Sequence, residues 1–226
     1  MINLSIVLGT YNRFVHLKGC VESIRKYVTR PYEIVIADGG STDGSREWMV
    51  TQDDIIMIGE RKLHGAVDAY NKAFSISSGE YVAHLNDDCY LQGFCLDAAC
   101  DIMDKDDAVG QVAIPFNDDS PKKSLNYINM NGVNILYANF GVVRKVVGSA
   151  VGWWGNYLYT YGGDCELSFQ IWNAGYRVVP LHGYAIYHHR TDDALRGENT
   201  SAVLDSRKFF DKWRGNVSKK WDSKEA

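Results

Sequence analysis

The sequence predicts an α/β domain with a Rossmann-like, mostly parallel central sheet and helices on both faces. Apolar strand segments alternate with helical patterns through the first half of the chain. Such a β-α-β series requires parallel strands with helices covering the sheet. The chain of 226 residues, 46% hydrophobic and 23% charged, is long enough for one such domain with a substantial core.

The first-half elements follow from the spacing of apolar residues. Leu17, Val21, Ile24 and Val28 recur at intervals of four, three and four, which marks one face of a helix after the first strand. A second helix is expected over about residues 66–76. The expected strands are 4–8, 33–37, 55–58 and 81–85, with a turn-rich segment at 38–44.

The second half is less regular. Residues 126–134 are ambiguous, and the tail at 219–226 is expected to be frayed. Gly175 is a suitable stop for a preceding helix. The other expected elements are a strand at 109–115, a polar loop at 117–123, a helix at 164–174, strands at 177–180 and 184–187, and a helix near 202–213.

Charge and composition exclude several classes of function. The formal net charge is −4 and no stretch is densely basic, so we expect no nucleic-acid partner. No apolar run approaches the roughly 20 residues that a membrane span needs. The five cysteines show no CxxC pairing and the N-terminus shows no leader pattern. Reduced thiols in a cytoplasmic protein are therefore the expectation.

Polar clusters follow three of the predicted strands. Residues 10–13, 38–43 and 86–88 each come directly after an apolar segment. In an open parallel sheet, ligands bind beyond the carboxyl ends of the strands. One acidic turn would be unremarkable, but three clusters on one edge indicate a binding site.

The cluster Asn86, Asp87 and Asp88 is a candidate metal site. Mg²⁺ and Mn²⁺ take oxygen ligands, commonly one or two carboxylates together with substrate phosphates. Such an ion neutralises the charge that grows on a departing diphosphate. The alternative is an Asx turn that simply closes the strand.

The glycine-rich segment 39–44 matches neither the dinucleotide fingerprint nor the phosphate loop of ATP-binding proteins. A turn followed by a helix cap from Ser41 or Thr42 explains most of it. Asp38 remains unexplained by that interpretation. It stands where a base or ribose could donate hydrogen bonds to it.

A second group of candidates lies late in the chain. Asp164 and Glu166 occupy the start of a predicted helix, either as dipole-complementing caps or as a general base. His188 follows a short strand, and with His189 it is either structural or a metal ligand. The aromatic residues Trp153, Trp154, Tyr157, Tyr159 and Tyr161 could stack on sugars or pack in the core.

These residues, taken in order, resemble the family 2 glycosyltransferases with the GT-A fold. The resemblance is strongest in four segments: 4–13, 33–45, 65–72 and 79–88. Looser similarity continues in residues 163–167 with 174–176, 187–189 and 209–213. Two positions depart from the family pattern. Asn86 stands where many members have Asp, and Gln170 stands where Arg is frequent.

The resemblance implies an inverting, metal-dependent transfer from a nucleotide-diphosphate sugar, with a UDP-sugar favoured, to a glycan or other acceptor hydroxyl. It implies a nucleotide-binding half at 1–91, an acceptor-side half at 92–200, and a C-terminal helix and tail at 201–226. Asp164 would be the catalytic base, while Asp88, Asn86 and His188 would hold Mn²⁺ or Mg²⁺. The donor-binding residues would be Thr10, Tyr11, Asn12, Arg13, Asp38, Asp68, Asn71 and Asp87.

Two other functions compete with this one. A sugar nucleotidyltransferase also combines an α/β sheet with a metal, but it needs a basic glycine-rich loop after the first strand. Residues 9–13 contain one Gly and one Arg. The second alternative is a protein that binds a nucleotide-sugar without turnover.

Overall fold

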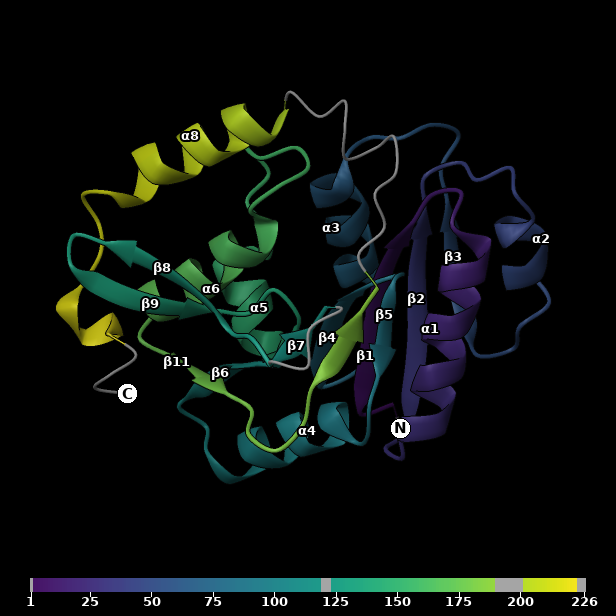
Figure 1. Cartoon of the computed structure of the whole chain (residues 1–226), viewed down its shortest axis with the longest axis horizontal. Coiled ribbons are helices and arrows are strands. Elements are labelled where there is room, and N and C mark those ends of the chain that lie inside the picture. The colour runs from purple at the N-terminus through teal and green to yellow at the C-terminus, as the bar shows by residue number, and fades with distance from the viewer. Residues whose placement is uncertain (1, 119–122, 190–200, 223–226) are drawn as a thin grey trace.

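The computed structural model describes residues 2–118, 123–189 and 201–222. Its central sheet contains strands β1 (Leu4–Thr10), β2 (Tyr32–Asp38), β3 (Ile55–Gly59), β4 (Tyr81–Asn86), β6 (Val109–Ala113), β10 (Gly141–Arg144) and β11 (Arg177–Pro180). They are ordered β11-β6-β10-β4-β1-β2-β3 (Figure 1). Only β10 runs against its neighbours, β4 and β6, so the predicted mostly parallel sheet is confirmed.

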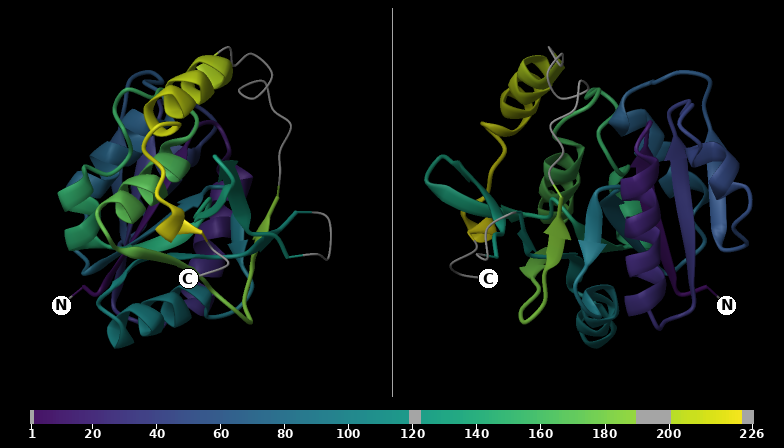
Figure 2. Two further views of the ribbon diagram at one scale, coloured as in Figure 1. Left: turned by 90° about the vertical axis from the view of Figure 1, so that its left-hand side faces the viewer. Right: turned by 45° about the vertical axis from the view of Figure 1, so that its right-hand side comes forward.

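Helices cover both faces of this sheet, as predicted (Figures 1 and 2). The helices are α1 (Phe14–Tyr27), α2 (Ser45–Met49), α3 (Ala66–Ile76), α4 (Cys95–Lys105), α5 (Lys145–Val151), α6 (Gly163–Asn173) and α8 (Ser201–Trp213). Apolar side chains of α1 and α4 form one core with the sheet, and those of α3 and α6 form the other.

The two cores explain why the strands read as continuous apolar runs. On β1, Ile6 packs in the α1–α4 core while its neighbour Val7 packs in the α3–α6 core, and both are fully buried. Successive side chains of a strand point to opposite faces, so a strand covered on both sides needs apolar residues at every position. The inner strands β1 and β4 are therefore buried almost to the residues at which they end.

Two small sheets complete the fold. Strands β5 (Cys89–Leu91), β12 (Ile186–His188) and β7 (Phe116–Asn117) form the first, in the order β5-β12-β7. Within it Cys89 lies opposite His188 in an antiparallel pair. This pairing brings a late segment of the chain against the end of β4. Across the described ranges, no helix has both the length and the apolar character needed to cross a bilayer.

Strands β8 (Asn126–Met130) and β9 (Val133–Tyr137) form a hairpin where the sequence was ambiguous. Its two-residue loop is Asn131-Gly132, with φ angles of 56° and 80°. Positive φ at both positions is the signature of a type I′ turn, which favours Asn-Gly. The dipeptide was thus a local signal for this hairpin.

The C-terminal segment is packed, and the expectation of a tail frayed from residue 219 is wrong for residues 219–222. A short 3₁₀ helix, η1 (Lys219–Trp221), buries Trp221 against Phe169 of α6 and Trp213 of α8. Burying the Trp221 indole against two other rings releases apolar surface from water, and this gain in free energy offsets the entropy lost when the segment is ordered. The rest of the predicted tail, 223–226, lies outside the described residues.

Neighbouring phenylalanines on α8 test this packing. Phe209 is 3% exposed and contacts Phe169, whereas Phe210 is 37% exposed. Phe209→Ala should lower the free energy of unfolding by about 3–5 kcal/mol, the usual cost of emptying a buried aromatic site. Phe210→Ala should lower it far less. Chemical denaturation of both variants checks this, and equal losses would contradict the described docking of α8.

Candidate functional site

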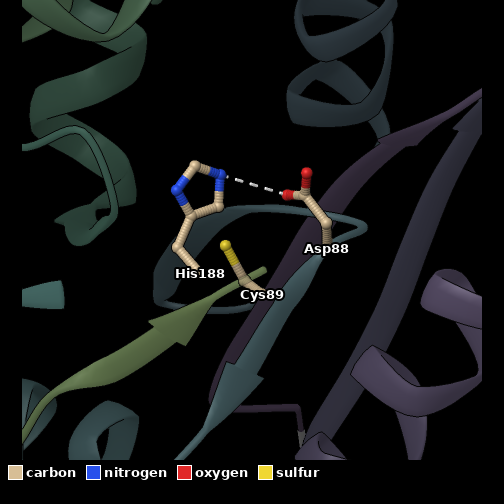
Figure 3. A group of neighbouring side chains, drawn as sticks. All are labelled: Asp88, Cys89 and His188. Atoms are coloured by element: carbon tan, nitrogen blue, oxygen red, sulfur yellow. Dashed lines mark ion pairs between the residues drawn. The ribbon is translucent and has the colours of Figure 1, made fainter. Parts of the chain in front are cut away.

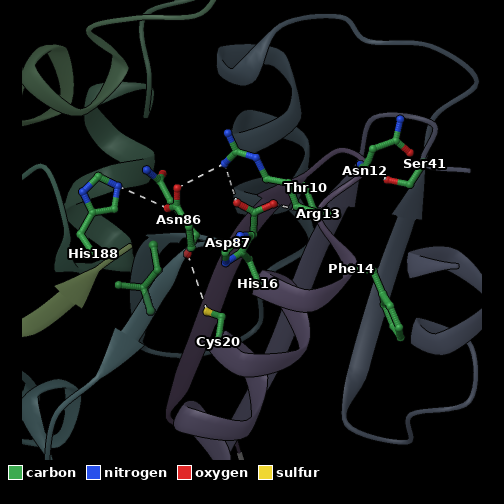
Figure 4. A network of polar contacts seen from close by, with 12 residues as sticks. Thr10, Asn12, Arg13, Phe14, His16, Cys20, Ser41, Asn86, Asp87 and His188 are labelled. Carbon is green, nitrogen blue, oxygen red and sulfur yellow. Dashed lines mark hydrogen bonds and ion pairs between the residues drawn. The ribbon is translucent and has the colours of Figure 1, made fainter. Parts of the chain in front are cut away.

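An acidic pair lies at the carboxyl end of β4. Asp87 and Asp88 are at most 2% exposed. Thr10 donates a hydrogen bond from Oγ1 to Asp87 Oδ2 over 2.8 Å. Arg13 places Nη1 3.0 Å from Asp87 Oδ1 and 3.4 Å from Asp88 Oδ2 (Figure 4). Because β1 pairs directly with β4, the clusters at 10–13 and 86–88 meet as the sequence predicted.

Burial raises the pKa of the Asp87 carboxyl to about 6, against the opposing effect of the Arg13 guanidinium. The neighbouring Asp88 raises it further because two like charges at close range resist ionisation together. A cation bound beside the two carboxylates would act as Arg13 does and favour their ionised forms.

His188 completes a group of possible metal ligands. Its Nε2 lies 3.3 Å from Asp88 Oδ1, and its Nδ1 lies 3.0 Å from Asp118 Oδ1. One ligand atom each from Asp88, Cys89 and His188 fall within 4.8 Å of one another (Figure 3). A metal-binding histidine commonly has its second ring nitrogen bonded to a carboxylate, which fixes the ring. The Asp88 carboxylate and the His188 ring fit a divalent cation such as Mn²⁺. Burial raises the pKa of the Cys89 thiol well above its usual value, so this neighbour stays protonated and is not a ligand of such an ion.

The other candidate metal ligands are arranged differently. Asn86 accepts a 3.3 Å hydrogen bond at Oδ1 from the Tyr70 hydroxyl. The ring of His189 stacks on His16, with centroids 4.9 Å apart, and only its backbone N–H reaches the Asp88 carbonyl. His188 is thus the histidine that faces the carboxylates. Sequence reasoning missed Cys89 and Asp118, because their proximity depends on pairing between β5, β12 and β7.

The loop after β2 is held by its own groups. Asp38 is fully buried and accepts hydrogen bonds from the backbone N–H of Gly40 and Ser41, at 3.2 and 3.1 Å. Arg46 Nε lies 3.2 Å from its Oδ2. These contacts fix the turn at the predicted nucleotide edge. Contact between Asp38 and a nucleoside stays a prediction.

Asn12 joins this loop to the loop after β1. Its backbone N–H donates to Ser41 Oγ over 2.9 Å, and its Oδ1 accepts from the Thr42 N–H over 2.7 Å. Asn12 has a φ of 51°, a conformation that Asn tolerates better than most residues. The expected helix cap from Ser41 or Thr42 is wrong, since α2 begins only at Ser45. Tyr11 is half-buried in the same loop.

Two donor-binding candidates on α3 have partners within the protein. Asn71 donates from Nδ2 to the Trp154 carbonyl over 2.8 Å and accepts at Oδ1 from its N–H over 3.1 Å. Asp68 forms an i,i+4 ion pair with Lys72 at 2.5 Å. Asn71 therefore anchors the segment before α6, and a donor role for either residue stays a prediction.

Asp164 and Glu166 differ sharply in their surroundings. Burial raises the pKa of the Asp164 carboxyl to about 6. Glu166 is fully buried and accepts from Tyr157 Oη at 2.5 Å, from Trp213 Nε1 at 2.6 Å and from Lys212 Nζ. Its oxygens are committed to holding α6 against α8. Of the two carboxylates, Asp164 is the one suited to receive a proton from a ligand.

The candidate aromatic residues also divide into two groups. The Trp154 ring stacks on Tyr70 and the Trp153 ring on Phe74, with centroids 4.2 and 4.6 Å apart. Both indoles therefore pack inside the protein. Tyr159 is 50% exposed, so stacking on a ligand remains possible only for the exposed tyrosines.

Comparison with known proteins gives one family. The sequence model of the family described as Glycosyl transferase family 2 matches residues 5–159. Glycosyltransferase AglE of Haloferax volcanii is 24% identical over 196 residues, covering 79% of this chain and 64% of that protein. The chain spans 27% to 64% of the lengths of the curated relatives that it matches.

Two solved structures share the fold. Mannosyltransferase PcManGT from Pyrobaculum calidifontis, in complex with GDP-Man and Mn²⁺, superposes with a TM-score of 0.73 at 17% identity, covering 96% of this chain and 65% of that one. S. aureus TarS 1–349 with UDP-GlcNAc gives 0.71 at 14% identity, covering 97% and 69%. This likeness establishes the architecture.

Metal binding tests the ligand geometry. His188→Ala should weaken Mn²⁺ binding, and His189→Ala should leave it unchanged, because only the first ring faces Asp88. Asp118→Asn should cost about 10–100-fold in Mn²⁺ affinity, the usual effect of a group that orients a ligand. Electron paramagnetic resonance of the free ion measures all three. A larger loss of Mn²⁺ affinity in His189→Ala than in His188→Ala would contradict the assignment and make His189 the ligand.

Proposed function

The chain belongs to glycosyl transferase family 2, and from this premise we propose that it transfers a sugar from a nucleotide-diphosphate donor to an acceptor hydroxyl, with inversion and with the aid of a divalent ion. The observation that carries the proposal is the edge formed by Asp88, His188 and Arg13 beside the loops after β1 and β2. These groups combine a nucleotide-binding edge with a site for the ion on the diphosphate.

The donor would lie across the carboxyl ends of β1, β2 and β4. The interlocked loops at Asn12 and Ser41 provide a preformed surface there. Asp38 and Asp68 would bind the nucleoside, with Thr10, Tyr11, Arg13 and Asn71 around it. UDP-sugars, which the family resemblance favours, are the first donors to test. GDP-sugars are the second, and the two structural neighbours contain one donor of each kind.

Asp88 and His188 would hold Mn²⁺ or Mg²⁺, with Asn86 adjacent. The ion supplies charge neutralisation for the leaving diphosphate. Asp164 then accepts the proton of the acceptor hydroxyl while that oxygen bonds to the anomeric carbon. The bond between that carbon and the diphosphate oxygen breaks in the same displacement, so configuration inverts. The acceptor would be a glycan or another hydroxyl compound.

The alternatives predict different products. A sugar nucleotidyltransferase would form a nucleotide-sugar from a sugar phosphate, and a binding protein would form nothing. Incubating the chain with Mn²⁺, a donor panel and candidate acceptors, and measuring nucleoside diphosphate release, tests the proposal. Donor binding without release under all conditions supports the binding protein. Release of pyrophosphate from a nucleoside triphosphate and a sugar phosphate supports the nucleotidyltransferase.

Asp164→Asn should abolish turnover while leaving donor affinity unchanged. The amide keeps the shape but accepts no proton, and a positioned general base typically contributes about 10²–10⁴-fold. Glu166→Gln should act differently. It disturbs the contacts with Tyr157, Lys212 and Trp213, so it should lower the melting temperature. Single-turnover transfer with parallel donor titrations measures both. Retention of most activity in Asp164→Asn would remove its assigned role.

The rate should also depend on pH through Asp164. The base must be ionised, and its pKa is raised to about 6, so the rate should fall as pH decreases below about 6 and be constant above it. Asp87 has a similarly raised pKa, so donor and Mn²⁺ are kept saturating at each pH. A rate at saturation that stays constant down to pH ~4, the ordinary carboxyl range, would contradict the assignment.

A further inference from the structure

Asp205 of α8 binds the backbone of the turn that precedes α6 in the chain. Its carboxylate accepts hydrogen bonds from the N–H groups of Tyr159, Thr160 and Tyr161, with shortest distances of 3.1, 2.9 and 3.1 Å. Asp205 is only 1% exposed. Lys208 Nζ lies 3.9 Å from it. Three consecutive N–H groups directed at one buried carboxylate make the shape of this turn depend on a charge from another element.

The turn, defined as residues 157–161, contacts the start of α3 and shortly precedes Asp164 in the chain. The Tyr159 carbonyl accepts from the Val67 N–H of α3 over 3.1 Å. Gly65 packs so closely there that an added Cβ would lie 2.4 Å from the Tyr159 oxygen. Only Gly162 and Gly163 separate Tyr161 from Asp164 in the sequence. A displacement of the turn would therefore reach both the start of α3 and the proposed base.

A second tie connects α8 to the same region. Lys212 and Trp213 bind Glu166 of α6, which also binds the hydroxyl of Tyr157 at one end of the turn. The segment 209–213 had no function assigned from the sequence beyond its resemblance to the family. In the structure this segment holds the first turn of α6, which contains both Asp164 and Glu166. Helix α8 thus holds the turn at two points, through Asp205 and through Glu166.

We propose that Asp205 is a positioning residue, which acts through the 157–161 turn to place Asp164 against the acceptor hydroxyl. This inference rests on the proposed transfer reaction. The proposed metal site at Asp88 is built from β1, β4 and β12, none of which Asp205 contacts in the described hydrogen bonds and ion pairs. Loss of its charge should consequently affect acceptor use and leave Mn²⁺ binding intact.

The matched variants are Asp205→Asn and Asp211→Asn. Both replace an aspartate of α8, but Asp211 is exposed. An amide at 205 presents an N–H₂ group to backbone N–H groups, so the turn should loosen. We expect kcat/KM for the acceptor to fall roughly 10–100-fold in Asp205→Asn, the scale of a small misplacement of reacting groups. Mn²⁺ affinity should match that of Asp211→Asn, which should behave as wild type.

The pH profile separates positioning from simple stabilisation. A loosened turn would admit water to Asp164, so its pKa should move down from about 6 and the acid limb of the rate should move with it. Lys208→Met keeps the carboxylate but removes the bond from Nζ to the Tyr157 carbonyl, so it should shift both readouts in the same direction by less. It serves as the second variant if Asp205→Asn does not fold.

Hydrogen exchange keeps this inference separate from the proposed function. Amide exchange at residues 159–161 should be faster in Asp205→Asn than in Asp211→Asn, even if no donor and acceptor pair supports transfer by the wild type. The absence of transfer would overturn the proposed function. Unchanged exchange would overturn the described tether. A lower melting temperature with unchanged acceptor kcat/KM and an unmoved acid limb would overturn the positioning role.

Discussion

The burial of two adjacent carboxylates at the end of β4 is the constraint on which the site depends. Removing Asp87 and Asp88 from water is costly unless partners compensate for both charges. The partners come from separate segments: Thr10 and Arg13 from the end of β1, and His188 from β12. The order β4-β1 in the main sheet and the pairing of β12 with β5 are therefore requirements of the site as well as of the fold.

The partners of each carboxylate separate the acidic residues by function. Glu166 and Asp205 are buried and accept hydrogen bonds from the protein's own groups, so each stabilises a turn or a helix contact. Asp38 likewise holds the turn after β2, and its contact with a nucleoside stays a prediction. Asp164 is half-buried with a raised pKa, which suits proton transfer. Asp88 lies beside a histidine whose other nitrogen is held by Asp118. The sequence shows only that these residues are acidic, so their different functions become apparent only from their contacts in the structure.

Local patterns predicted the first half of the fold well. The expected helix at 66–76 matches α3, and the clusters after β1, β2 and β4 meet at one edge because adjacent parallel strands end together. Helix α4 was not predicted, and neither was β10, whose antiparallel position depends on pairing with both β4 and β6. The Asn131-Gly132 dipeptide is a local hairpin signal within a segment whose apolar pattern is ambiguous.

Prediction of the site had the same limit. Asp88 and His188 were candidates from their strand-end positions, and the structure brings them within 3.3 Å. Cys89 and Asp118 were not candidates, because their proximity to His188 follows from cross-strand register between distant segments. The interlock between Asn12 and Ser41 likewise joins two loops 29 residues apart in sequence.

The most direct test of the account is the position of the ion in crystals grown with Mn²⁺ and a nucleoside diphosphate. An anomalous difference map at the manganese edge should show a peak within bonding distance of Asp88 Oδ1 and His188 Nε2, with the diphosphate on its open side. A bound nucleotide with no peak there, or a peak on other carboxylates such as Glu60 and Asp68, would contradict the assignment of this edge as the metal site.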